Sequence, residues 1–113
     1  MNNIFTALND SDFNSIVRNL GNTNGIFIYL SPWDSKSQLI REFVLGKLDW
    51  KSDIPIYLLD SFEAPKSFSF FSISTVPCMV ICNGKYRYKV LNTVSSIEKE
   101  LTTLSRLESS FYN

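Results

Sequence analysis

Two short apolar segments separated by an amphipathic one constrain the fold of this chain most. Residues 26–30 and 54–60 are almost wholly apolar and have the length of buried strands. Residues 35–46 between them carry apolar side chains at the spacing of one helix face. A strand, a helix and a second strand in this order form a right-handed crossover with parallel strands. We therefore expect an α/β fold in which residues 26–30 are buried on both faces of a sheet, with Pro55 at the start or edge of the second strand.

Local signals predict two more elements around this unit. Residues 12–20 place their apolar side chains on one face of a helix, with Ser11 as the N-cap. Residues 79–82 and 86–91 flank the Asn83-Gly84 turn. Both turn residues tolerate the positive φ angles of a type I′ turn, so the two segments predict an antiparallel hairpin.

The last helix is predicted over residues 95–111. Ser95 and Glu98 there have the pattern of a capping box, followed by an apolar stripe of Ile97, Leu101, Leu104, Leu107 and Phe111.

Residues 61–74 alternate phenylalanine with serine and read as a short irregular helix or a loop packed by its aromatic residues. The whole is one domain, residues 1–113, with a central mixed sheet of about four strands flanked by helices.

The charge balance of the chain argues against several classes of partner. Eleven Lys and Arg residues balance eleven Asp and Glu residues, so no positive field attracts nucleic acid or anionic lipid. No segment approaches the roughly 18 apolar residues of a membrane span, and the N-terminus lacks the pattern of a signal peptide. We expect a cytoplasmic protein or a component of a soluble assembly, without a nucleic-acid or membrane partner.

The chain has only two cysteines, Cys78 and Cys82, and no histidine. Four residues apart on one strand, their Cα atoms are about 13 Å apart, which is too far for a disulfide. A structural zinc site takes four ligands, almost all Cys or His. We therefore expect two free thiols in the core and assign no metal and no cofactor.

Two further segments have the spacing of a known family. The segment Ser31-Pro32-Trp33-Asp34-Ser35-Lys36-Ser37 leads from the first apolar strand into a helix, and Thr75-Val76-Pro77-Cys78 leads into the hairpin, with Pro77 43 positions after Asp34. With the order of elements, these segments resemble the thioredoxin family, in which a strand ends in a W-C-x-x-C motif that faces a cis-proline. The resemblance implies a thioredoxin-like fold with a cis Val76–Pro77 bond.

The departures from the family pattern concern its chemistry. Asp34 and Ser37 stand at the positions of the two cysteines, and the family's buried acid would fall at Ile28. Disulfide exchange needs a thiolate to attack and a second thiol to resolve the mixed disulfide, so the resemblance implies a degenerate member without redox catalysis. We assign no catalytic residue. Asp34 reads as a helix N-cap, with a general base or nucleophile as the alternative.

Two surfaces are candidates for binding a partner. The first contains Trp33, Val76 and Pro77, where Trp33 is either an exposed contact residue or packed on the start of the helix. The second contains Phe68 and Phe70, in a segment that is either a satellite core or an exposed docking loop. We expect Leu91 and Asn92 to crowd the first surface, since the family keeps a glycine near them, and this slightly favours the second.

The leading hypothesis is a redox-inactive thioredoxin-like module that binds another protein as a subunit or accessory of a larger assembly. A composition rich in Asn, Ser, Ile, Phe and Tyr is typical of AT-rich genomes and suggests a phage protein with a structural role in the virion or a role in host interaction. The alternative is a thioredoxin-like thiol enzyme or transferase that uses Cys78, which would lie beside the turn at Ser35.

Overall fold

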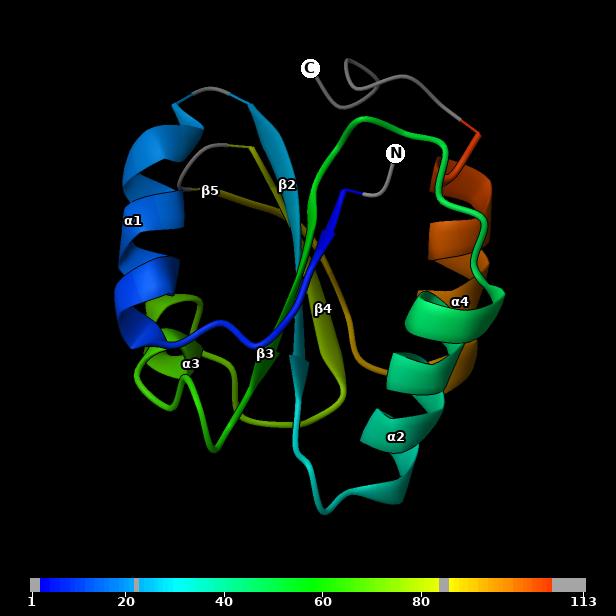
Figure 1. Cartoon of the computed structure of the whole chain (residues 1–113), viewed down its shortest axis with the longest axis horizontal. Coiled ribbons are helices and arrows are strands. Elements are labelled where there is room, and N and C mark those ends of the chain that lie inside the picture. The colour runs from blue at the N-terminus through cyan, green and yellow to red at the C-terminus, as the bar shows by residue number, and fades with distance from the viewer. Residues whose placement is uncertain (1–2, 22, 84–85, 107–113) are drawn as a thin grey trace.

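Five strands form one mixed sheet in the computed structural model, and helices cover both of its faces (Figure 1). The structure describes residues 3–21, 23–83 and 86–106. The strands lie in the order β1 (Ile4–Phe5), β3 (Ile56–Asp60), β2 (Asn24–Leu30), β4 (Cys78–Asn83) and β5 (Tyr86–Leu91). The first three are parallel, whereas β4 runs antiparallel to β2 and β5 antiparallel to β4. The predicted α/β class is therefore confirmed.

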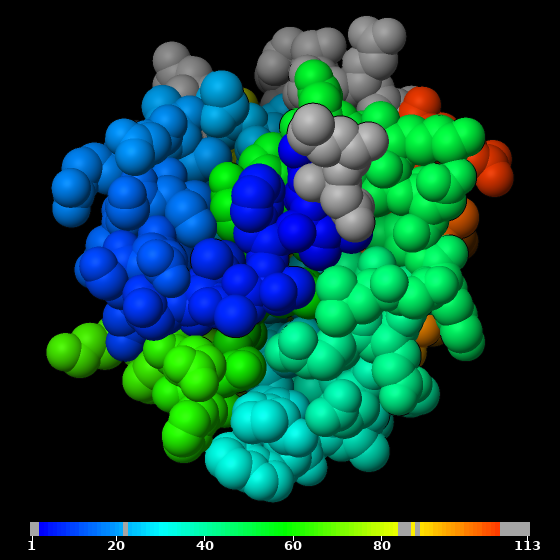
Figure 2. Space-filling model, in the orientation of Figure 1, coloured from blue at the N-terminus to red at the C-terminus, as the bar shows by residue number. Residues whose placement is uncertain are grey.

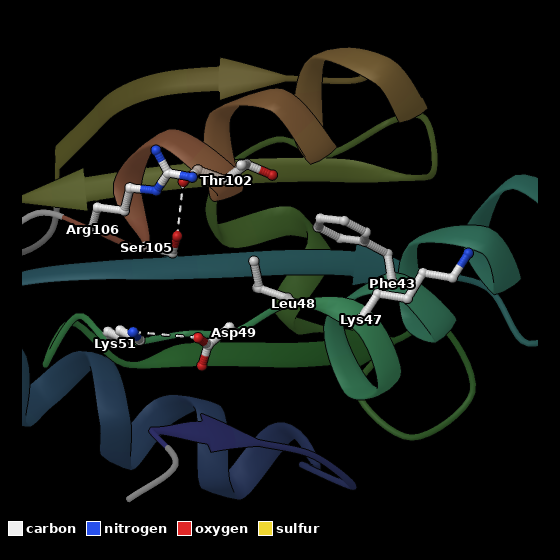
Figure 3. Close-up of a pocket in the computed structure, with 8 residues that line it drawn as sticks. All are labelled: Phe43, Lys47, Leu48, Asp49, Lys51, Thr102, Ser105 and Arg106. Atoms are coloured by element: carbon white, nitrogen blue, oxygen red, sulfur yellow. Dashed lines mark hydrogen bonds and ion pairs between the residues drawn. The ribbon is translucent and has the colours of Figure 1, made fainter.

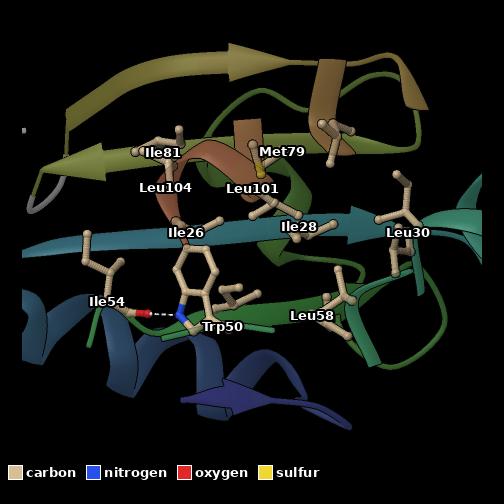
Figure 4. Close-up of a cluster of buried hydrophobic side chains, with 14 residues drawn as sticks. Ile26, Ile28, Leu30, Trp50, Ile54, Leu58, Met79, Ile81, Leu101 and Leu104 are labelled. Atoms are coloured by element: carbon tan, nitrogen blue, oxygen red, sulfur yellow. Dashed lines mark hydrogen bonds between the residues drawn. The ribbon is translucent and has the colours of Figure 1, made fainter. Parts of the chain in front are cut away.

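The central strand β2 separates two apolar cores. Ile26, Ile28 and Leu30 face α2 (Ser35–Glu42) and α4 (Val94–Leu104), in the cluster drawn in Figure 4. Phe27 and Tyr29 face the other way, toward α1 (Asp10–Leu20) and the segment around α3 (Ser67–Phe70). Successive side chains of a strand point to opposite faces, so one apolar run serves both cores. Every residue of β2 is buried, as predicted for the middle of a sheet.

The crossover from β2 to β3 has the predicted form. The two strands are adjacent and parallel, with Ile28 opposite Leu58, and α2 with the π-helical turn η1 (Phe43–Lys47) connects them. Trp50 anchors the return to the sheet: its buried indole Nε1 donates a hydrogen bond of 2.8 Å to the Ile54 carbonyl (Figure 4). Pro55 immediately precedes β3, as expected for a residue that cannot donate to the ladder.

The sheet has one strand more than the sequence predicted. β1 contains only Ile4 and Phe5, and it pairs parallel with β3 opposite Ile56 and Tyr57. A strand of two residues is too short to show a hydrophobic period in the sequence. Its formation depends on pairing with the edge of β3 and not on a local sequence signal.

Helix α1 begins earlier than predicted. Its N-cap is Asn9, whose side chain accepts a hydrogen bond of 2.8 Å from the Asp12 amide, while the Asp12 carboxylate accepts one of 3.0 Å from the Asn9 amide. The Ser11 cap was therefore wrong, because the reciprocal Asn9–Asp12 pair satisfies two backbone donors and adds Asp10 and Ser11 to the helix. The helix ends at Gly21, whose φ of 59° suits glycine.

Helix α4 also has a different cap from the one predicted. Thr93 is the N-cap and forms the capping box with Ser96, so the Ser95–Glu98 box was wrong. Both pairs have the right spacing, but the extended backbone of Thr93 places its hydroxyl where it accepts from the Ser96 amide at 3.2 Å. Of the predicted stripe, Ile97, Leu101 and Leu104 are buried. Leu107 and Phe111, like Gly84 of the predicted hairpin turn, lie outside the described residues.

This assignment of the cap is testable with two single variants. Thr93→Ala should lower the free energy of unfolding by about 1 kcal/mol, since it removes the acceptor for the Ser96 amide. Ser95→Ala, two residues further on, is the matched control and should change the free energy of unfolding little. Urea denaturation followed by circular dichroism measures both, and a larger effect of Ser95→Ala would contradict the structure.

Candidate functional site

The turn between β2 and α2 contains the two residues that replace the expected cysteines. The Asp34 carboxylate accepts a hydrogen bond of 2.8 Å from the Ser37 amide and is the N-cap of α2. The Ser37 side chain is 1% exposed, and its hydroxyl accepts a hydrogen bond of 3.0 Å from the Ser31 amide. Both side chains therefore hold the turn and the first helical turn together, and the N-cap interpretation of Asp34 is confirmed.

Trp33 projects from this turn into solvent, with 79% of its side chain exposed. Its ring contacts that of Phe62, which is 68% exposed, in an edge-to-face arrangement with centroids 6.1 Å apart and an interplanar angle of 83°. Trp33 is therefore exposed and not packed on the start of the helix, and its role as a contact residue stays a prediction. We call these two residues the aromatic pair.

Phe62 reaches Trp33 because the chain turns sharply after β3. The Asp60 carboxylate accepts hydrogen bonds of 2.9 Å and 2.7 Å from the Phe62 and Glu63 amides, the pattern of an Asx turn. Since β2 and β3 are adjacent and parallel, their carboxyl ends lie at the same edge of the sheet (Figure 1). Sequence analysis did not single out Phe62, although an aspartate after a buried strand was a signal for such a turn.

A groove lies on the β4 side of this turn. The Val76–Pro77 peptide bond is cis, with Val76 half-buried and Pro77 buried. The groove has a volume of about 440 Å³ and is lined by Lys36, Val76, Pro77, Asn92, Thr93, Val94, Ser95 and Glu98. Trp33 does not line it.

The expected crowding of this groove by Leu91 is not found. Leu91 lies opposite Met79 and packs against the core between the sheet and α4. Side chains alternate along β5, so Leu91 turns inward while Asn92, just after the strand, is exposed and lines the groove. Of the two residues expected to crowd the groove, Leu91 therefore does not, whereas Asn92 lines it.

Most of the phenylalanine segment belongs to the second core. Phe71 is buried, and the ring of Phe68 packs edge-on against Tyr29 with centroids 4.8 Å apart. Phe70 is 45% exposed and contacts Phe13 at 5.4 Å. The satellite-core interpretation is thus correct for Phe68, and of the two phenylalanines of α3 only Phe70 is exposed.

This segment is held in place from a distant part of the chain. The Asp10 carboxylate, at the start of α1, accepts hydrogen bonds from the Lys66 and Ser67 amides at 3.2 Å and 2.9 Å. Phe68 and Phe70 therefore lie with α1 on the face of the sheet opposite α2, and the two predicted partner surfaces are separate (Figure 1).

Both thiols are buried on β4 in the second core. Burial raises the pKa of the Cys78 thiol, an effect that the charge of Arg87 partly offsets. Burial also raises the pKa of Cys82 to about 11, and its Sγ donates to the Gly25 carbonyl at 3.4 Å. Cys78 directly follows Pro77, but it is only 4% exposed and protonated at neutral pH, so it lacks the properties of a nucleophilic thiolate.

Within the described residues, neither the family's buried acid nor a cluster of metal ligands is present. Ile28, at the position of the family's buried acid, lies in the apolar cluster between the sheet and α2. Among the residues that the structure describes, no group of three or more His, Cys, Asp or Glu side chains is placed to hold a metal ion. No helix within these residues is long and apolar enough to cross a membrane.

Another hollow, of about 350 Å³, lies between η1 and the end of α4 (Figure 3). Lys47 lies at one end of it, and Lys51 and Arg106 lie at the other. Lys51 pairs with Asp49 at 3.6 Å, with both side chains largely exposed. Lys47 ends η1 and Arg106 follows α4, positions where cations stabilise the helix dipole. Because the cations do not converge, we assign no ligand to this hollow.

Solved thioredoxins share this architecture. Thioredoxin O2 from Arabidopsis thaliana in its oxidised state matches with a TM-score of 0.72 and 17% identity, covering 92% of this chain and 96% of that one. Spinach chloroplast thioredoxin f matches with a TM-score of 0.69 and 15% identity, covering 92% and 94%. The Schistosoma mansoni thioredoxin pre-protein matches with a TM-score of 0.65 and 12% identity, covering 88% and 96%.

At these identities the similarity is one of fold. No family model matches the chain, and no curated protein matches it in sequence. The protein is therefore an α/β protein with a thioredoxin-like fold, as the resemblance implied.

The buried thiols predict a pH dependence of stability. The folded state holds the Cys82 proton up to a pKa of about 11, whereas the unfolded chain releases it near the ordinary value of 9.0. The unfolded state therefore binds fewer protons between these values, and stability should fall as the pH rises from 9 to 11, by at most about 1.4 kcal/mol per pH unit.

The contribution of Cys82 is measured by urea denaturation of the wild type and of Cys82→Ala across this pH range. The wild type exceeds Cys82→Ala in the free energy of unfolding, and this difference should shrink as the pH rises. The reason is that only the wild type has the Cys82 thiol, which loses its proton more readily in the unfolded chain. A difference that does not change with pH would contradict the raised pKa.

Proposed function

We propose that this protein is a thioredoxin-like interaction module that binds another protein and does not catalyse disulfide exchange. The observation that carries the proposal is the state of the turn at the end of β2. Asp34 and Ser37 are engaged in backbone hydrogen bonds of 2.8 Å and 3.0 Å, and neither is a thiol. The two cysteines that the chain does have are buried.

The aromatic pair is the binding surface that these observations favour. Trp33 and Phe62 are 79% and 68% exposed and touch one another, so they form a continuous apolar surface next to the turn. Exposed apolar surface costs solvation free energy, and tryptophan is enriched among the residues that dominate binding energy at protein interfaces. Val76 and Pro77 lie on the neighbouring groove, so a partner that covers the pair has further apolar surface within reach.

The composition supports the kind of assembly that we propose. With equal numbers of acidic and basic residues, the chain has no net charge to attract nucleic acid or anionic membranes. Its richness in Asn, Ser, Ile, Phe and Tyr is typical of AT-rich genomes. We therefore propose a subunit or accessory of a larger assembly, either a phage virion or a complex with a host protein in the cytoplasm.

The first test is an insulin disulfide reduction assay with dithiothreitol as the electron donor. We expect no turnover above the rate without protein, because the turn has no thiol and both cysteines are buried and protonated. Turnover that Cys78→Ser abolishes would overturn the proposal and establish the alternative, a thiol enzyme using Cys78. The unfolding midpoint of Cys78→Ser, measured in parallel, separates loss of chemistry from loss of fold.

The second test asks which surface binds the partner. A tagged wild-type protein is used to isolate the partner from the native host, and affinity is then measured with purified components. Trp33→Ala and Phe62→Ala should each weaken binding by at least about 2 kcal/mol while leaving thermal unfolding nearly unchanged, since both side chains are exposed.

The matched control is Leu45→Ala, which removes a similarly exposed apolar side chain, 53% accessible, from η1. This variant should bind like the wild type. Loss of binding in Phe70→Ala, with Trp33→Ala unaffected, would move the surface to α3. Binding unchanged in all of these variants would contradict the aromatic pair and the phenylalanine segment alike.

A further inference from the structure

A separate cleft opens on the β3 side of β2, whereas the Pro77 groove lies on the β4 side. It has a volume of about 410 Å³, within the range of small-molecule sites. Four parts of the chain line it. These are the segment after β1 with Thr6 and Leu8, Pro32 in the turn before α2, helix α2 with Arg41, and β3 with Leu58 and Asp60 together with Glu63 just after it. These segments meet on the face turned toward the viewer in Figure 2.

The topology of the sheet explains why a cleft forms there. The chain leaves β2 toward the face covered by α2 and leaves β3 toward the face covered by α1 and α3. Adjacent parallel strands whose connections depart to opposite faces leave a crevice beyond their carboxyl ends, and open α/β sheets bind ligands at such crevices. The side chains that line this crevice then decide which ligand fits.

The charged groups in the cleft are incompletely paired. A guanidinium nitrogen of Arg41 lies 3.9 Å from Asp60 Oδ2, an ion pair too long for a hydrogen bond. Asp60 Oδ1 accepts from the Phe62 and Glu63 amides, so Oδ2 is the atom directed at Arg41. Among the residues that the structure describes, the Arg41 guanidinium donates no hydrogen bond, although its side chain is only 32% exposed.

The arrangement of these charges points to one class of ligand. Asp60 and Glu63 disfavour a simple anion, and Arg41 disfavours a simple cation. A ligand with a carboxylate and an ammonium group on one carbon matches both signs over the short distance between Arg41 and Asp60. Its carboxylate accepts two hydrogen bonds from the Arg41 guanidinium, and its ammonium donates to Asp60 Oδ2.

Two apolar residues complete the match. Leu8 is half-buried and Leu58 is buried, and both line the cleft beside the charged pair. Leu8 offers apolar surface to an aliphatic side chain, and Leu58, which is 2% exposed, lies behind it. We propose that this cleft binds a free α-amino acid with an aliphatic side chain, independently of the partner that the aromatic pair is proposed to bind.

The experiment is an NMR titration of the ¹⁵N-labelled full chain with L-leucine. We expect saturable shifts of the amide signals around Leu8, Gln38 and Asp60. Sodium acetate and methylammonium chloride at the same concentrations each carry one of the two charges and should bind at least tenfold more weakly. No saturable shift with L-leucine would overturn the proposal, as would acetate that binds equally well.

The variant that decides the role of the guanidinium is Arg41→Gln. It should weaken L-leucine binding at least tenfold, while its spectrum outside the cleft stays that of the wild type. The matched control is Lys51→Gln, which removes an exposed cation remote from the cleft and should bind like the wild type. If Arg41→Gln binds L-leucine as tightly as the wild type with the fold intact, the proposed site is wrong.

Discussion

The burial of β2 on both faces is the constraint on which the rest of the structure depends. Its odd and even positions supply two different cores, and it pairs with β3 on one side and β4 on the other. A strand in this position cannot shift by one residue without exchanging the side chains of the two cores. The carboxyl end of β2 is therefore fixed, and with it the turn that presents Trp33 and begins α2.

Hydrogen bonds accepted by Asp34 and Ser37 hold the turn between β2 and α2 in shape. Two cysteine thiols at these positions would be weaker hydrogen-bond acceptors. Asp34 presents a charged acceptor to the Ser37 amide, and the Ser37 hydroxyl is a stronger acceptor for the Ser31 amide than a thiol sulfur. An N-cap of this kind is worth about 1 kcal/mol, and a buried hydrogen bond contributes a similar amount. The residues at the expected cysteine positions thus stabilise the turn and the start of α2.

The sequence predicted correctly those elements whose signal is local or strongly periodic. The apolar runs of β2 and β3 stand out because each depends on neighbouring residues alone, whereas the cis Val76–Pro77 bond was predicted from the resemblance to the thioredoxin family. The errors concern choices between equivalent local patterns, as with Ser11 against Asn9, or contacts between distant segments. Phe62 meets Trp33 only because β3 lies beside β2 in parallel register. Phe68 is partly buried only because α3 lies against Tyr29 and is bound by the Asp10 carboxylate.

The two clefts beside the turn differ in chemistry because they lie on opposite sides of β2. On the β4 side, the chain enters the sheet through Val76 and Pro77, which have no charge and line a groove together with Lys36 and Glu98. On the β3 side, Asp60 is needed to turn the chain after the strand, and its carboxylate brings a negative charge within 3.9 Å of Arg41. Since α2 contributes Lys36 to one wall and Arg41 to the other, the same helix supplies the cation of both. The turn after β2 is therefore flanked by two clefts with different linings, and α2 contributes a cation to each.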